Sequence, residues 1–250
     1  MIYPNQPYVP NIKSAEMDWK SAEMDWKPVE AGTKTAHIVF ILDDSGSMGS
    51  VRDATISGFN EFLLGQKRSE VPTRVSLYTF GGIDTKLVYS RIPAPEAPDL
   101  THETYAANGY GTNLLDAIGD VLITVNTATA KTTLVADRDS ITVVILTDGA
   151  ENCSRKFDKE AISKMVKTAE SYNWAFMFLG ANIDAFSTGA SLGFIVSNTM
   201  QYKTSNMADT MKSASRMAVT LNNTRAAGMD VNTAYAAAAF TAAERKEADK

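Results

Sequence analysis

Between residues 36 and 226, short apolar runs alternate with longer segments in which apolar side chains recur at helical spacing. The run 37–42 is almost continuously apolar, which is typical of a strand buried on both faces. Gly81 and Gly82 separate two strand-like segments and predict a hairpin. The predicted strands are 37–42, 74–80, 85–89, 141–146, 174–179 and 194–196. The predicted helices are 50–67, 112–125, 158–172, 181–192 and 206–226.

This alternation predicts βαβ units and therefore a doubly wound α/β fold with helices on both faces of a central sheet. We expect a mostly parallel sheet of five parallel strands plus one antiparallel edge strand. Residues 91–111 are rich in proline, glycine and polar residues, and they predict a long surface loop. Methionines and alanines form one stripe of the predicted helix 206–226, which indicates core packing.

The two ends of the chain differ from this pattern. Residues 1–35 begin with a proline- and tyrosine-rich stretch and continue with a perfect tandem repeat, SAEMDWK at 14–20 and again at 21–27. We favour a recent duplication in a tolerant arm. The alternative is a docking arm in which Trp19 and Trp26 bind a partner, because tryptophan is enriched at binding hot spots. Residues 227–250 are alanine-rich and then charged, and we expect a tail. The predicted domain is therefore 36–226.

Composition narrows the classes of function. A net charge of −5 gives no overall basic footprint for nucleic acid. We find no apolar run near the roughly 20 residues of a membrane span, so we expect no membrane partner. A single cysteine excludes an internal disulfide framework, and two histidines argue against a histidine-based metal site. The start of the sequence does not resemble a secretory signal, so we expect a cytoplasmic protein, or a phage protein made in the host cytoplasm.

Oxygen-bearing side chains follow three of the predicted strands. Asp43, Ser45 and Ser47 follow the first strand, Thr112 opens the helix after the long loop, and Asp148 follows the strand 141–146. In doubly wound sheets, ligands bind beyond the carboxyl ends of the strands, where these residues should meet. A set of hard oxygen donors suits Mg²⁺, Mn²⁺ or Ca²⁺. Neutral hydroxyl ligands would leave much of the cation's charge to attract an anion from outside.

The pattern Asp43-x-Ser45-x-Ser47, followed by Thr112 and Asp148, resembles the metal-ion-dependent adhesion site of von Willebrand factor A domains. The resemblance covers roughly 36–226. The segments FNEFL, GTNLLDAIG, TDGAENCS and FLGANIDA make the chain similar to small stand-alone A domains of bacteria and their phages. The resemblance to the adhesion site implies that Ser45 and Ser47 bind the metal directly. Thr112 would bind directly or through water, the aspartates mostly through water, and an aspartate or glutamate of a protein partner would complete the coordination.

Residues beside this set are candidates for partner binding. We expect the loop 91–111 and residues 150–155 to choose the partner, and the candidates there are Tyr110, Asn113, Glu151 and Asn152. Glu151 and Asn152 could equally cap the following turn. Asp44 could be a further ligand, but we expect a variable position that faces solvent. Cys153 is expected to be a small residue in a partly buried turn, and His37 to be structural.

Three classes of function remain. The first is a metal-dependent protein-binding module. The second is a structural component of a phage particle or another assembly, which would use the N- and C-terminal arms because both look unable to bury themselves. The third is an enzyme, for which the chemistry is incomplete: Ser45 stands where a phosphatase of the Asp-x-Asp type needs its acid–base aspartate, and the sequence has no G-x-S-x-G elbow or Walker loop. We therefore expect no enzymatic activity.

Overall fold

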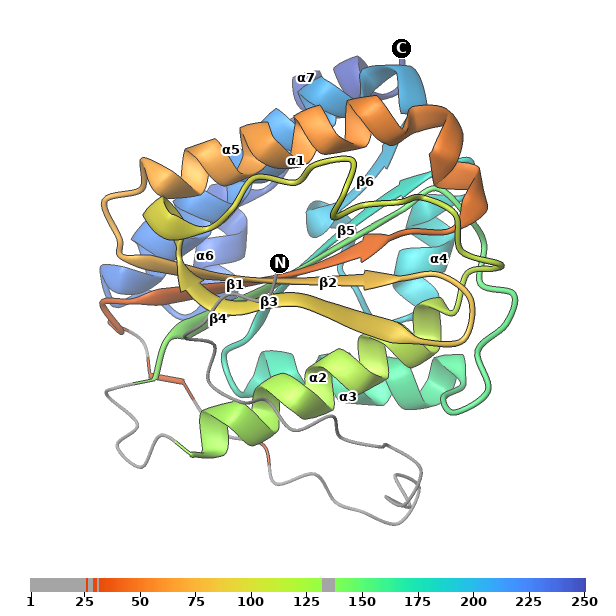
Figure 1. The fold of residues 1–250 in the computed structure, drawn as a ribbon. Coiled ribbons are helices and arrows are strands. Elements are labelled where there is room, and N and C mark those ends of the chain that lie inside the picture. Colours follow the sequence, from red (N-terminus) through yellow and green to blue (C-terminus); the bar gives the residue numbers. More distant parts are fainter. Residues whose placement is uncertain (1–25, 27–28, 31, 132–137) are drawn as a thin grey trace.

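The computed structural model describes residues 26, 29–30, 32–131 and 138–250. A central sheet lies between two layers of helices (Figure 1). The strands are β1 (Ala36–Asp43), β2 (Thr73–Phe80), β3 (Thr85–Pro93), β4 (Ser140–Thr147), β5 (Ala175–Ala181) and β6 (Thr199–Tyr202). The α-helices are α1 (Arg52–Lys67), α2 (Leu114–Ala130), α3 (Lys159–Ser171), α4 (Ala185–Ser191), α5 (Met207–Ala226), α6 (Val231–Ala238) and α7 (Ala242–Ala248). Short 3-10 turns are η2 (Gly46–Val51), η3 (Ala94–Glu96), η5 (Val196–Asn198) and η6 (Thr204–Asn206).

The sheet has the order β3-β2-β1-β4-β5-β6. Strand β3 runs antiparallel to β2, and all the other neighbours are parallel. This confirms the predicted doubly wound α/β architecture with one antiparallel edge strand. Strand order reverses between β1 and β4, so the loops after β1 and β4 leave the sheet side by side at its carboxyl edge.

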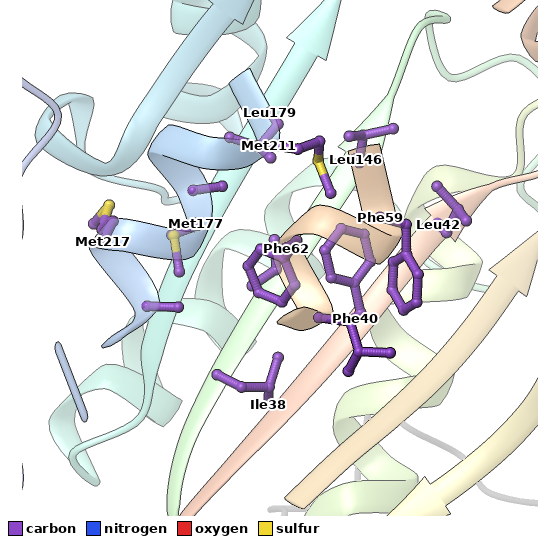
Figure 2. Packing of buried hydrophobic residues seen from close by; sticks show 14 of the residues in the cluster. Ile38, Phe40, Leu42, Phe59, Phe62, Leu146, Met177, Leu179, Met211 and Met217 are labelled. Carbon is purple, nitrogen blue, oxygen red and sulfur yellow. The ribbon is translucent and has the colours of Figure 1, made fainter. Parts of the chain in front are cut away.

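Alternation along β1 assigns its side chains to the two helical layers. Phe40 faces α1 and α5, whereas Val39 and Ile41 face α2 and α3. On the first face, the ring of Phe40 makes edge-to-face contacts with Phe59 and Phe62, each at 5.1 Å between centroids (Figure 2). The continuous apolar run of β1 is therefore explained by burial on both sides.

Helices α1 and α5 pack closely because α1 presents glycine where they meet. A Cβ added to Gly58 would lie 2.8 Å from Cγ of Met211, and one added to Gly65 would lie 2.0 Å from Oγ of Ser215. Met207, Met211 and Met217 are buried, which confirms that the methionine stripe of α5 is core. Figure 2 shows Met211 and Met217 in this core.

The last strand lies later in the chain than the sequence pattern predicted. The predicted strand 194–196 is wrong, since β6 begins at Thr199 and residues 196–198 form a 3-10 turn. Phe194 is buried because its ring stacks on Phe178 at 5.3 Å between centroids, so its apolar character reflects packing outside the sheet. The helix predicted from residue 181 starts at Ala185, after Asp184 accepts a capping hydrogen bond from the backbone nitrogen of Ser187.

The C-terminal residues form helices α6 and α7, which pack against α5. Ala234, Tyr235, Phe240 and Ala248 are buried. The hydroxyl of Tyr235 donates to Oε1 of Glu170 at 3.0 Å and accepts from the backbone nitrogen of Phe176 at 2.7 Å. The expectation that this segment could not bury itself is therefore wrong. The division of the chain at residues 35 and 226 stays a prediction.

At the other end of the chain, Trp26 is 7% exposed and its ring lies edge-on to Trp174 at 5.4 Å between centroids. Val29 is also buried, and its backbone nitrogen donates to the carbonyl of Tyr172 at 3.2 Å. No described helix is long and apolar enough to cross a membrane.

Candidate functional site

The first part of the site is the end of β1. Asp43 is completely buried, and its two carboxylate oxygens have different partners. Oδ1 accepts a hydrogen bond from the backbone nitrogen of Ser45 at 2.8 Å, and Oδ2 accepts one from the hydroxyl of Thr147 at 2.6 Å. Burial raises the pKa of Asp43 to about 6 against the opposing effect of these hydrogen bonds. Asp43 thus fixes the turn that carries the two serines and joins it to the end of β4.

The hydroxyls of Ser45 and Ser47 and the carboxylate of Asp148 converge at this edge of the sheet. Oγ of Ser45 lies 3.1 Å from Oγ of Ser47. Ser47 donates to Oδ1 of Asp148 at 2.6 Å, across 101 residues of sequence. Burial raises the pKa of Asp148, and its hydrogen bond with Ser47 acts in the opposite direction. The structure therefore brings together residues from two strand ends, as the topology predicted.

Thr112 approaches the same place from the loop before α2. Gly149, directly after Asp148, makes room for it: a Cβ on Gly149 would lie 3.1 Å from Oγ1 of Thr112 and 3.8 Å from Oγ of Ser47. Thr112 is buried, and its backbone nitrogen donates to Oδ1 of Asn152 at 2.9 Å. The loop before α2 thus brings Thr112 to the side of Gly149 that Ser47 also faces, at the carboxyl edge of the sheet.

Three backbone segments touch directly beneath the site. Gly109 donates from its backbone nitrogen to the carbonyl of Asp44 at 2.8 Å and accepts from the backbone nitrogen of Gly46 at 2.8 Å. A Cβ on Gly109 would lie 2.7 Å from the carbonyl carbon of Gly81, and a Cβ on Gly81 would lie 2.9 Å from that of Asp44. Glycine is required at 81 and 109 because backbone approaches backbone at these positions.

Asp44 is not the solvent-facing residue that we expected. It is 8% exposed, and its Oδ1 accepts a hydrogen bond from the backbone nitrogen of Ala107. Burial raises its pKa. The side chain turns inward because the loop 97–113 covers it. The sequence pattern gave no indication of this contact with Ala107, which lies 63 residues away. Asp44 fastens the loop that carries Thr112 rather than offering a ligand at the surface.

Glu151 and Asn152 have structural partners. Oε2 of Glu151 accepts from the backbone nitrogen of Leu115 at 2.9 Å, and its Oε1 accepts from the backbone nitrogens of Cys153 and Ser154 at 2.9 and 2.7 Å. Asn152 pairs with Thr112 through two hydrogen bonds, one from each backbone nitrogen. Of the two roles considered for these residues, the structure shows turn and helix capping. They position Thr112 and the start of α2.

The other candidates for partner binding separate into exposed and buried residues. Tyr110 is fully exposed, whereas Asn113 is 1% exposed and does not reach the surface. Trp26 is covered by its own chain through Trp174, so its ring is not presented to a partner. Trp19 lies outside the described residues.

Cys153 and His37 have the structural roles expected of them. The thiol of Cys153 is partly buried and donates to the carbonyl of Gly82 at 3.1 Å, and burial followed by the charge of Glu151 raises its pKa. His37 is buried at the opposite end of β1, with Nε2 at 2.8 Å from the hydroxyl of Ser76. Neither lies among the converging oxygens.

Sequence reasoning missed two residues that support the site. The hydroxyl of Thr147 holds Asp43, and the hydroxyl of Tyr105 donates to the carbonyl of Asp43 at 2.7 Å. Thr147 could have been found from its place beside Asp148 at the strand end. Tyr105 carries no local signal, because it reaches Asp43 across 62 residues and from inside an irregular loop.

The donor set fits a hard divalent cation. It consists of three hydroxyls and two carboxylates, and it contains no nitrogen or sulfur donor. Oγ of Ser47 lies 3.1 Å from Oγ of Ser45 and 2.6 Å from Oδ1 of Asp148, so oxygens from two strand ends contact one another directly.

The fold and the arrangement of these loops define a class: the chain has the fold of a von Willebrand factor A domain. It is similar to proximal thread matrix protein 1 of the mussel byssus in a form with a zinc-occupied metal-ion-dependent adhesion motif, with a TM-score of 0.53, 12% identity, and coverage of 78% of this chain and 49% of that chain. It is also similar to the pilus adhesin SpaC of Lactobacillus rhamnosus GG, with a TM-score of 0.55, 13% identity, and coverage of 78% and 31%. The A domain protein of Catenulispora acidiphila gives a TM-score of 0.51 at 13% identity, with coverage of 80% and 52%.

The chain spans about half the length of the mussel structures that it matches. No protein-family model and no curated protein matches the sequence. At these identities the likeness concerns the fold, and the function has to be argued from the site itself.

Proposed function

We propose that this protein is a divalent-metal-dependent protein-binding module. Asp43, Ser45, Ser47, Thr112 and Asp148 would hold Mg²⁺, with Mn²⁺ or Ca²⁺ as alternatives, and an aspartate or glutamate of a protein partner would complete the coordination. The observation that carries the proposal is the convergence of Ser45, Ser47 and Asp148 through O···O distances of 3.1 and 2.6 Å at the carboxyl edge of the sheet. Neighbours of the same fold include a pilus adhesin and a protein with a metal-occupied adhesion motif, which supports this choice.

Asp43 positions the two serine hydroxyls, which would contact the cation. Asp43 is buried and holds the serine turn through the backbone nitrogen of Ser45, so the two hydroxyls are fixed before a ligand arrives. Such preorganisation lowers the ordering cost of binding. A bound cation would supply electrostatic attraction for a carboxylate, and the attraction is strong because hydroxyl ligands are neutral.

The alternative is an assembly component that uses the terminal arms because they look unable to bury themselves. The packing of α6 and α7 removes that reason for the C-terminal arm. In the N-terminal arm, Trp26 is covered, and residues 1–25 lie outside the described residues.

Metal binding is tested by calorimetric titration of the full chain with Mn²⁺ and with Mg²⁺. We expect binding of one ion, with affinity lowered by more than about tenfold in Asp148→Ala and in Ser47→Ala. Asp209→Ala removes an exposed carboxylate from the first turn of α5 and is the matched control. Equal affinity in all four proteins would refute the proposed ligand set.

Partner binding is tested by affinity capture in Mg²⁺ and in EDTA with wild type and Asp148→Ala. A partner retained only by the wild type in Mg²⁺ supports the proposal. A partner retained under every condition assigns the interaction to another surface.

A further inference from the structure

Two segments whose backbones are hydrogen-bonded near the proposed metal site carry exposed apolar side chains. Six large hydrophobic residues are prominently exposed within the described part of the chain: Ile83, Leu87, Tyr110, Ile195, Val196 and Met229. The first three belong to the β2–β3 hairpin and to the loop before α2, the same two segments that meet under the site. Tyr110 is fully exposed and Ile83 is 71% exposed.

Tyr110 projects from a backbone that is fixed on both sides. Gly109 before it is bound to Asp44 and Gly46 by two hydrogen bonds of 2.8 Å, and the carbonyl of Gly111 after it accepts from the backbone nitrogen of Gly82 at 2.9 Å. Because this backbone is already fixed, little conformational entropy is lost when a partner covers the aromatic ring. Tyrosine is enriched at binding hot spots, and a fully exposed tyrosine on a rigid backbone is suited to that role.

Ile83 is coupled to the same support. It follows Gly82, whose backbone nitrogen binds Gly111 and whose carbonyl accepts from the thiol of Cys153 at 3.1 Å. The hairpin tip, the loop carrying Tyr110 and the loop after β4 are therefore hydrogen-bonded to one another. We call Tyr110 and Ile83 the apolar rim. Thr112 lies two residues beyond Tyr110, so the rim borders the converging oxygens.

We propose that the apolar rim selects the partner. The occupant is a surface loop of another protein that presents a carboxylate together with an apolar side chain a few residues away. This inference rests on the proposed function. A metal site alone accepts any accessible carboxylate, and carboxylates are common on protein surfaces. Both side chains of the rim are uncharged, and the exposed carboxylate of Asp84 follows Ile83 directly, so the rim favours a carboxylate with an apolar neighbour over one within a strongly acidic segment.

The test uses a displayed library of random disulfide-closed peptides, selected on the full chain in Mg²⁺. We expect enriched peptides to share one aspartate or glutamate and an apolar residue near it. Their affinity should fall by about tenfold or more in the double variant Ile83→Ser/Tyr110→Ser, which corresponds to the removal of one hot spot. Val196→Ser, at a 59% exposed residue outside the rim, is the matched control and should bind like the wild type.

The outcomes separate the two proposals. Peptides that need Mg²⁺ and Asp148 but bind the double variant unchanged overturn the rim and leave the metal-dependent function standing. Peptides that bind equally in EDTA overturn the metal-dependent function. A library that yields no acidic binder dependent on the rim also overturns the proposed partner. The same conclusion follows if the wild type self-associates in sedimentation and the double variant does not. Retained Mn²⁺ binding by the double variant shows that any loss comes from the rim and not from misfolding.

Discussion

The carboxylate of Asp44 accepts a hydrogen bond from the backbone nitrogen of Ala107, a residue with a φ of +52°. A non-glycine residue in this left-handed region is strained by roughly 1 kcal/mol or more. The contact therefore holds the loop before α2 in a conformation that it would not adopt alone. That loop carries Thr112. Asp44, which lies between the proposed ligands Asp43 and Ser45 in the sequence, therefore also helps to position Thr112.

Replacing Asp44 tests this relationship. Asp44→Ala leaves the buried nitrogen of Ala107 without an acceptor, and we expect the free energy of unfolding to fall by about 1–3 kcal/mol in urea denaturation. Asp44→Asn keeps an acceptor oxygen and should recover part of the loss. Full stability in Asp44→Ala would show that the loop is held by its other contacts.

Gly109 should not tolerate a side chain. Its Cβ would lie 2.7 Å from the carbonyl carbon of Gly81, and backbone cannot move aside cheaply. We expect Gly109→Ala to weaken Mn²⁺ binding in calorimetry by more than about tenfold, because the shift separates Thr112 from Ser47. In Gly46→Ala the nearest atom lies 3.4 Å away, so this variant should keep most of the affinity. Similar affinities in the two variants would contradict the close approach.

His37 should make stability depend on pH. Burial, followed by the charge of Arg91, lowers its pKa from 6.5 to about 3, while Asp139 opposes and Arg74 reinforces the shift. Between these values the unfolded chain binds a proton that the folded chain does not. Stability therefore falls as pH decreases from about 6.5 toward 3, by up to about 1.4 kcal/mol per pH unit.

The check is urea unfolding from pH 7 to pH 4 for the wild type and for His37→Gln, which cannot titrate there. The raised pKa of Asp43 acts in the opposite direction over part of this range, so the difference between the two proteins is the quantity to compare. Parallel profiles would show that His37 does not stay neutral when buried.

Trp26 should stabilise the domain although it lies in the duplicated segment. Its ring is covered and contacts Trp174, so Trp26→Ala should lower the free energy of unfolding by about 3 kcal/mol. Trp26→Phe keeps an aromatic contact and should lose less. An unchanged midpoint in thermal unfolding of Trp26→Ala would favour the tolerant-arm interpretation of this copy.

The strands and the proposed ligands were predictable for the same physical reason. A strand buried on both faces, such as β1 with Val39 and Phe40 in opposite layers, leaves a continuous apolar run in the sequence. Parallel strands end at one edge, so Asp43 and Asp148 could be placed near each other without knowing any distance.

Contacts between distant irregular segments left no such pattern. Phe194 looked like a strand residue because burial by stacking on Phe178 has the same apolar signature as burial in a sheet. Asp44 looked exposed because its acceptor role depends on a loop 63 residues away. Tyr235, in an alanine-rich segment, gave no sign that its hydroxyl would bind Glu170 and Phe176.

The C-terminal helices also close one edge of the sheet. Beyond β6, the backbone nitrogen of Lys203 donates to the carbonyl of Ala248 at 2.8 Å, and Arg245 donates to the carbonyls of Val196, Ser197 and Thr199. An uncovered strand edge is a template for pairing with other chains. At the opposite edge, β3 carries register irregularities that hinder such pairing. Residues far from the proposed metal site thus cover an edge that could otherwise pair with another chain, and we expect a variant that loosens α7 to lose solubility first.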